Sequence, residues 1–279
     1  MATSQCYVLV AANDNLDQPT VAELKKDLER GNDNVKIDTM RTILTNMVNG
    51  DPCPELLMHI IRFVLPSKNK ILKKLLQFYW EICPKTTPDG KLRQEMILVC
   101  NAIRNDLQHP NEYIRGSTLR SLCKIHEIEI LEPLLPSIRS CLEHRHSYVR
   151  KNAVFALHSV FKHSPQLAPD TAELIYAFLL AEADMACRRN AFVALSSAEP
   201  GLAAQYLKDN LGQVSEFEEL FQLAIVDFIR KEGRNNPSQR TKFLRCVAEL
   251  LESSSHAVQY EAATTLVSLS SNPVAVKAA

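Results

Sequence analysis

Two stretches of the chain nearly repeat each other. One reads NEYIRGSTLRSL (residues 111–122), and the other reads HSYVRKNAVFAL (residues 146–157), which begins 35 residues further on. Both place a tyrosine, a branched aliphatic residue and an arginine before a run of small, polar and apolar residues. The same pattern returns at Arg188 and, more loosely, at Gln259. A period of about 36 residues predicts that one structural unit recurs about seven times along the chain.

Hydrophobic periodicity predicts that this unit is helical. From about residue 21 onward, apolar residues recur three and four positions apart in segments of about 10–18 residues, each ended by Pro, Gly, Asn or Ser. One such segment, KLRQEMILVCNAIRNDL, predicts a helix over residues 91–107 with a second, flanking line beside its main apolar stripe, which consists of Leu92, Met96, Val99, Ile103 and Leu107. Alternating strand patterns are almost absent. We therefore expect an all-α protein, a right-handed α-α superhelix of the HEAT or armadillo kind built from about seven helical hairpins.

The pattern also predicts where the helical trunk begins and how it ends. Residues 1–19 have no sustained periodicity and are rich in turn-forming residues, so we expect an irregular N-terminal tail and a helical trunk over residues 20–279. The sequence NPVAVKAA predicts a further helix that opens at Pro273 with Asn272 as its cap. Because half a repeat leaves an apolar face uncovered, we expect a trunk that is truncated at its C-terminus or completed by a partner.

The repeated residues have mechanical roles in such a hairpin. A polar residue, whose side chain can accept free backbone N–H groups, precedes each expected second helix at Asn111, Ser147, Asp184 and Ser255. The arginine in the first turn has five N–H donors that can reach carbonyl or carboxylate groups of the adjacent repeat. We therefore interpret these arginines as structural rungs between repeats and not as a duplicated chemical site: Arg115, Arg150 and Arg188.

The composition excludes several functional classes. The chain has only seven glycines and no glycine-rich loop of the kind that cradles phosphate groups. Its 32 Lys and Arg residues balance 32 Asp and Glu residues, whereas a nucleic-acid-binding protein normally concentrates positive charge. No apolar run approaches the length of about 18–20 residues that crosses a bilayer. These observations favour a soluble protein that binds other proteins, with no cofactor.

The cysteines and histidines predict neither a metal site nor a catalytic site. The eight cysteines are widely spaced, with no C-x-x-C pair, so we expect reduced structural thiols in a cytosolic protein. His144 and His146 are two positions apart at a helix boundary, which places them on different faces without a third ligand. Cys123 and His126 form a possible thiol–base pair, but nothing in the sequence orients them. We therefore predict no enzymatic activity.

Loop sequences that do not repeat identify the chain as similar to a known family. The segments PKTTPDG (residues 84–90) and LEHRHSYVRKNA (residues 142–153), with the apolar segments around them, closely resemble the N-terminal trunk of the beta-coatomer family, the adaptin-like large subunits of the COPI vesicle coat. The resemblance is strong over residues 56–157 and weaker beyond. Residues 1–20 and 200–218 depart from it most.

This resemblance implies a non-enzymatic scaffold with several protein partners. Members of the family assemble with the delta, gamma and zeta coatomer subunits. An Arf-family GTPase in its GTP form recruits the assembly to Golgi membranes, where the coat carries retrograde cargo to the endoplasmic reticulum. The implied location is therefore the cytoplasm, with peripheral association with the Golgi membrane and COPI vesicles. In the family, early trunk helices bind the GTPase, and the concave surface embraces the small partner subunit.

For the GTPase contact we predict the second line of the 91–107 helix: Ile97, Cys100 and Arg104. The alternative is that neighbouring helices cover this line completely. Three other functions remain open at this point: a large subunit of a clathrin-type adaptor, another HEAT-repeat interaction scaffold, and a HEAT-like DNA glycosylase. The glycosylase is disfavoured, because it would need a basic groove and a buried catalytic carboxylate.

Overall fold

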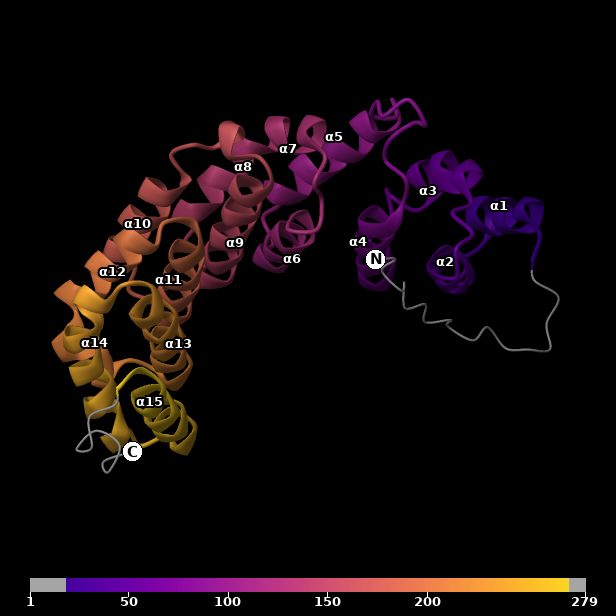
Figure 1. Cartoon of the computed structure of the whole chain (residues 1–279). Helices are drawn as coiled ribbons and strands as arrows, with labels where there is room; N and C mark the ends of the chain where they lie inside the picture. Colours follow the sequence, from indigo (N-terminus) through magenta and orange to yellow (C-terminus); the bar gives the residue numbers. More distant parts are fainter. Residues whose placement is uncertain (1–18, 271–279) are drawn as a thin grey trace. The chain divides into compact units, whose positions relative to one another are not determined.

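The computed structural model describes residues 19–270, and these residues are all-α (Figure 1). They form fifteen α-helices and six short 3₁₀ helices, and the described part contains no β-strand. The predicted all-α helical-repeat class is thereby confirmed. The trunk consists of two compact units, one ending at Ile138 and the other beginning at Arg139. The predicted tail (residues 1–19), except its last residue, and the predicted helix opening at Pro273 lie outside the described residues.

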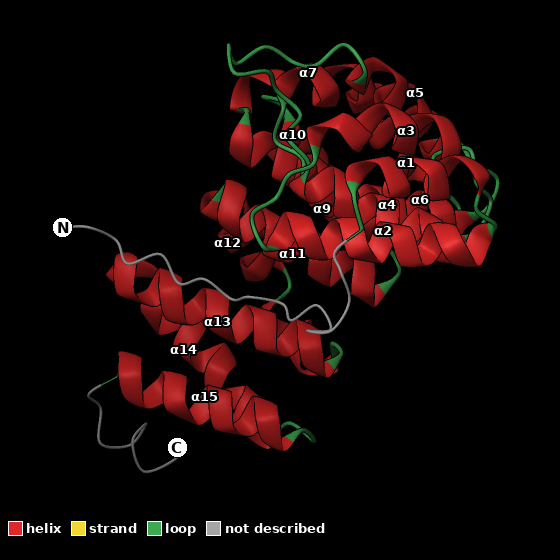
Figure 2. Cartoon of the chain, turned by 90° about the vertical axis from the view of Figure 1, so that its right-hand side faces the viewer, coloured by secondary structure: helices red, strands yellow, loops and turns green. Residues whose placement is uncertain are grey.

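Unit 1 contains paired helices in two layers. Its α-helices are α1 (Val21–Arg30), α2 (Asp33–Val48), α3 (Leu57–Phe63), α4 (Lys70–Ile82), α5 (Met96–Leu107), α6 (Glu112–Leu122) and α7 (Ile128–Leu131), and α8 (Leu135–Ser140) crosses the boundary. Helices α1, α3 and α5 form one row and α2, α4 and α6 the other (Figure 2). Each hairpin packs on the next, so both rows contribute to one core.

Unit 2 repeats this plan with longer helices. It contains α9 (Ser147–His163), α10 (Thr171–Ala181), α11 (Met185–Ala198), α12 (Pro200–Asp209), α13 (Glu219–Asn235), α14 (Pro237–Glu249) and α15 (His256–Leu269). Helices α9, α11, α13 and α15 pack against one another in sequence, and α10, α12 and α14 cover them. Taken in chain order, the helices form seven successive pairs if α7 and α8 are counted together as the first helix of the pair that α9 completes. This agrees with the predicted number of about seven hairpins.

Three of the four predicted helix caps are in place. Asn111 accepts the backbone N–H of Tyr113, Asp184 accepts that of Cys187, and Ser255 accepts that of Val258. The fourth prediction, Ser147, is wrong by one position. His146 caps α9, and its Nδ1 accepts the N–H of Tyr148 at 3.2 Å. An imidazole can replace a hydroxyl here because its unprotonated nitrogen is also an acceptor.

The predicted helix over residues 91–107 begins later than expected. Helix α5 starts at Met96, and the preceding residues form a loop with an isolated bridge between Thr86 and Leu92. Gly90 turns this loop in the left-handed region with a φ of 77°. Buried Lys85 holds the loop in place by donating to the carbonyls of Glu81 and Cys83, and it lies 3.5 Å from a carboxylate oxygen of Glu127. Leu92 therefore belongs to the loop and not to the helical stripe.

Buried cysteines contribute to both cores. The described cysteines are all free thiols, and every one except the half-buried Cys123 is buried. Burial raises the pKa of Cys246 to about 12 and that of Cys83 to about 11. A thiol whose pKa is raised in this way is a poor nucleophile at neutral pH. The cysteines therefore pack as small apolar residues.

An aromatic cluster forms the centre of unit 2. The ring of Phe192 in α11 lies 6.0 Å from Tyr206 in α12, and 5.6 Å and 5.4 Å from Phe221 and Phe228 in α13. Two of these contacts are edge-to-face, the arrangement that the aromatic quadrupole favours. One residue thus joins three helices.

Phe192→Ala should lower the free energy of unfolding by about 3–5 kcal/mol, because it empties a fully enclosed site. Val193→Ala, at the exposed neighbouring position, is the matched control and should change it by less than about 0.5 kcal/mol. Chemical denaturation of the full chain measures both. Equal losses in the two variants would contradict this account of the core.

Candidate partner-binding surface

The predicted line on α5 is split between surface and core. Ile97 is 60% exposed, and its neighbour Leu98 is also exposed. Cys100 is 7% exposed, and its Sγ lies 3.8 Å from the carbonyl oxygen of Ile130 in α7. Arg104 is half-buried and donates to the carbonyl of Pro133 at 3.4 Å. The neighbouring helix therefore covers Cys100, which we remove from the predicted contact, while Ile97 stays open to a partner.

A shallow groove of about 500 Å³ runs between α3 and α5 next to this surface. Its apolar lining comes from Met58, Ile61, Leu65, Leu98 and Ala102. Arg62, Asn101 and Asn105 supply the polar part of the rim. Apolar side chains with a few polar groups at the edge are typical of the centre of a protein–protein contact. We call Ile97, Leu98 and the groove together the α5 surface.

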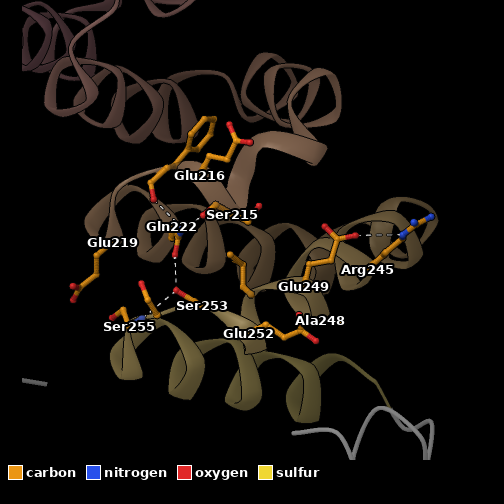
Figure 3. A pocket seen from close by; sticks show the side chains of 13 residues that line it. Ser215, Glu216, Glu219, Gln222, Arg245, Ala248, Glu249, Glu252, Ser253 and Ser255 are labelled. Carbon is orange, nitrogen blue, oxygen red and sulfur yellow. Dashed lines mark hydrogen bonds and ion pairs between the residues drawn. The ribbon is translucent and has the colours of Figure 1, made fainter.

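A second cleft, of about 1010 Å³, lies in unit 2 and is polar (Figure 3). Carboxylates surround it, from Glu216, Glu219, Glu249 and Glu252. The amide of buried Gln222 forms part of its wall, donating to the carbonyls of Ser215 and Phe217 and accepting from Ser253 Oγ. Because these bonds satisfy the buried amide, they serve to join α13 to the turn before α15.

The three predicted rung arginines make three different sets of contacts. Arg150 forms a bidentate pair with Glu182, with N–O distances of 2.6 and 2.8 Å, and it also donates to the carbonyls of His144 and Arg145. Arg115 donates to the carbonyls of Gln108 and His109, in the loop of its own hairpin. Arg150 therefore bonds both to its own loop and to a side chain of the next hairpin, whereas the hydrogen bonds of Arg115 go to its own loop.

Arg188 stacks within the aromatic cluster of unit 2. Its guanidinium lies 4.9 Å from the centre of the Phe217 ring and donates to the hydroxyl of Tyr206. Cation–π contacts of this kind are strongest where water is excluded. Arg188 thus joins α11 to α12 and to the turn before α13. The stability that each of the three arginines contributes stays a prediction.

The repeat contains a loop clamp that the sequence reading missed. In each of four loops, the side chain six positions before the repeat's arginine (Gln259 in the fourth copy) accepts the backbone N–H of the residue two positions after itself. The pairs are His109 with Asn111, His144 with His146, Glu182 with Asp184, and Ser253 with Ser255. In three of these loops, the backbone carbonyl of that accepting residue also receives a hydrogen bond from the side chain six positions later. Arg115 donates to His109, Arg150 to His144, and Gln259 to Ser253. Aligning the residues before each arginine would have revealed this position.

The ion pair with Arg150 contributes to a lowered pKa of Glu182. Burial acts to raise the pKa of Glu182, but the hydrogen bonds and charge of Arg150 and the N–H of Asp184 outweigh it, so the net shift is downward. Arg139 similarly lowers the pKa of Asp170 through paired hydrogen bonds of 2.8 and 2.6 Å. Both carboxylates therefore stay ionised at neutral pH.

Arg150→Ala should lower the free energy of unfolding by about 1–3 kcal/mol, because the buried carboxylate of Glu182 loses its charged donor and keeps only the backbone N–H groups of Ala183 and Asp184. Arg145→Ala, an exposed arginine in the same loop, is the control and should have little effect. A lowered carboxylate pKa stabilises the fold above the ordinary glutamate value of 4.5, and this contribution is lost as the pH falls through the folded-state pKa. The difference in free energy of unfolding between parent and variant, measured by urea denaturation, should thus be smaller at acid pH than at pH 7. A difference that persists unchanged in acid would contradict the assignment.

The described residues contain neither a metal-ligand cluster nor a membrane-crossing helix. No three His, Cys, Asp or Glu side chains among them come together as a metal site. Within residues 19–270, every helix is too short or too polar to pass through a bilayer. What the structure offers a partner is an apolar protein surface on a helical-repeat trunk.

The architecture defines a helical-repeat protein, and a family model identifies which kind. The model of the adaptin N-terminal region matches residues 17–279. The chain belongs to the adaptin N-terminal family.

Curated relatives confirm the resemblance to beta-coatomer. The chain is 52% identical to coatomer subunit beta of Pongo abelii over 278 residues, 53% to that of Drosophila melanogaster over 279, and 49% to that of Saccharomyces cerevisiae over 275. These alignments cover 100%, 99% and 98% of this chain, but only 29%, 29% and 28% of those proteins. The chain thus spans less than a third of the length of these relatives.

Solved structures share the fold at low sequence identity. A model of the full-length AP-3 complex matches with a TM-score of 0.68 and 20% identity, covering 84% of this chain and 41% of that one. The karyopherin Kap121p, bound to the extreme C-terminus of the phosphatase Cdc14p, matches with a TM-score of 0.62 and 14% identity, covering 88% and 29%. These likenesses support the helical-repeat fold alone. With coatomer beta near 50% identity, a clathrin-type adaptor subunit is not favoured.

Proposed function

We propose that this chain is a non-enzymatic scaffold segment of a COPI coat subunit, and that it acts in Golgi-to-endoplasmic-reticulum and intra-Golgi transport. The observation that carries the proposal is identity near 50% with coatomer subunit beta along the whole chain. The trunk offers helical surfaces for protein contacts, and its buried thiols have raised pKa values that disfavour nucleophilic chemistry.

The proposed partners are those of a coat assembly. The delta, gamma and zeta coatomer subunits would form a hetero-oligomer with the full-length protein, and an Arf-family GTPase in its GTP form would recruit it. The chain would then be cytoplasmic and associate with the Golgi membrane and COPI vesicles through these partners. No nucleic acid is involved in this proposal, in keeping with the neutral net charge.

The α5 surface is the proposed GTPase contact. Ile97 and Leu98 project from the helix into solvent, beside a groove that has apolar walls and a polar rim. Two exposed apolar side chains flanking such a groove provide the central apolar anchor that protein contacts need. Arg104 lies at the edge of this surface, where its bond to Pro133 fixes its position.

Ile97→Asp should abolish binding of the full chain to a GTP-loaded Arf-family GTPase, because it places a charge in the apolar centre of the contact. Phe78→Asp on α4 is the matched control, since Phe78 is also 60% exposed, and it should bind as the parent does. Pull-down with GTP-locked and GDP-bound GTPase measures the effect, and circular dichroism and melting temperature confirm that both variants fold. Undiminished binding of the folded Ile97→Asp variant would rule out this surface.

A further inference from the structure

Helix α4 carries a second apolar stripe beside the face that packs into its core. Its buried side consists of Leu72, Leu76, Tyr79 and Trp80. The outward side carries Ile71, Leu75, Phe78 and Ile82, which we call the α4 stripe. Phe78 is 60% exposed, Ile71 and Ile82 are also exposed, and Leu75 is half-buried. A single amphipathic face does not require these residues, so the second stripe is available for a partner.

The spacing within the stripe matches the contact line between two packed helices. The residues follow one another at intervals of four, three and four positions, as the apolar positions of a coiled-coil seam do. Such a line is narrow and runs along the helix axis. An α-helix laid lengthwise along α4 buries all four side chains at once, whereas a strand or a flat surface does not follow them.

Two positive charges near the beginning of the stripe are unpaired. Lys70 and Lys74 are exposed, and neither has an ionic partner within the described part of the chain. Lys73, between them, differs because it pairs with Asp106 at 3.3 Å. Lys70 is also the first residue of α4, where the helix dipole disfavours a cation. A carboxylate from a partner would relieve both conditions.

Nearby acidic side chains argue against a lipid surface as the occupant. Asp33 of α2 accepts from Asn69 at the start of α4, and Glu81 lies at the other end of the stripe, 3.5 Å from Lys124. A layer of anionic headgroups would place negative charge along the whole stripe, next to these carboxylates as well, whereas a helix can place its carboxylates beside Lys70 and Lys74 alone.

We propose that the α4 stripe binds an acidic amphipathic α-helix of a partner protein, packed along α4 with its carboxylates beside Lys70 and Lys74. The surface lies in a different helix row from α5. The proposal therefore does not depend on the GTPase contact, and either one can fail alone.

Two synthetic helices of opposite charge test the proposal. Both are three-heptad peptides with leucine at the a and d positions, and they carry glutamate or lysine at e and g. Fluorescence anisotropy with the full chain should show binding of the glutamate peptide and weaker binding of the lysine peptide. Phe78→Asp should weaken binding of the glutamate peptide by about ten-fold or more. Ile97→Asp, at an equally exposed position on α5, should leave this affinity unchanged.

A charge reversal supplies the second arm of the test. The double variant Lys70→Glu and Lys74→Glu should no longer bind the glutamate peptide and should bind the lysine peptide instead, while its helicity stays unchanged. Failure of the glutamate peptide to bind the parent, equal binding of both peptides, or equal loss in Phe78→Asp and Ile97→Asp would overturn the proposal. Co-sedimentation with anionic phosphatidylserine vesicles that Phe78→Asp abolishes would overturn it in favour of a lipid surface.

Discussion

Burial of apolar side chains between successive hairpins is the interaction on which this structure depends. A single pair of helices cannot enclose both of its apolar faces, so each hairpin is stable only when the next one covers it. Unit 2 shows how this works, because Phe192 of one hairpin packs against Tyr206 and Phe228 of the next. The loop clamps are secondary. They fix where each helix begins, and hydrogen bonds between the helix ends and the loops then satisfy backbone groups that the helix leaves free.

The same constraint explains why binding surfaces form on this trunk. Helices of both rows need one face for the core, and the residues on their exposed faces are free to differ. On α5 the face that points away from the core carries Ile97 and Leu98, and on α4 it carries Phe78. Exposed aliphatic and aromatic side chains cost solubility unless a partner covers them. A coat subunit, which works in contact with other proteins, is a setting in which such surfaces are used.

The sequence predicted the helical class and the repeat because both depend on local spacing. The caps at Asn111, Asp184 and Ser255 were also predictable, since a cap acts over two or three residues. The start of α5 was not, because its loop is held by a bridge from Leu92 to Thr86 and by buried Lys85. Nor could spacing show that Cys100 is covered while Ile97 is not. That difference depends on α7, which lies about thirty residues further along the chain.

Amide hydrogen exchange of the full chain, with and without an Arf-family GTPase, tests the central claim most directly. If the trunk is a coat scaffold whose α5 surface receives the GTPase, the GTP-bound form should slow exchange over Met96–Leu107 and Leu57–Phe63, and the GDP-bound form should not. Unchanged exchange in these two helices with the GTP-bound form, or equal slowing by both nucleotide states, would contradict the account.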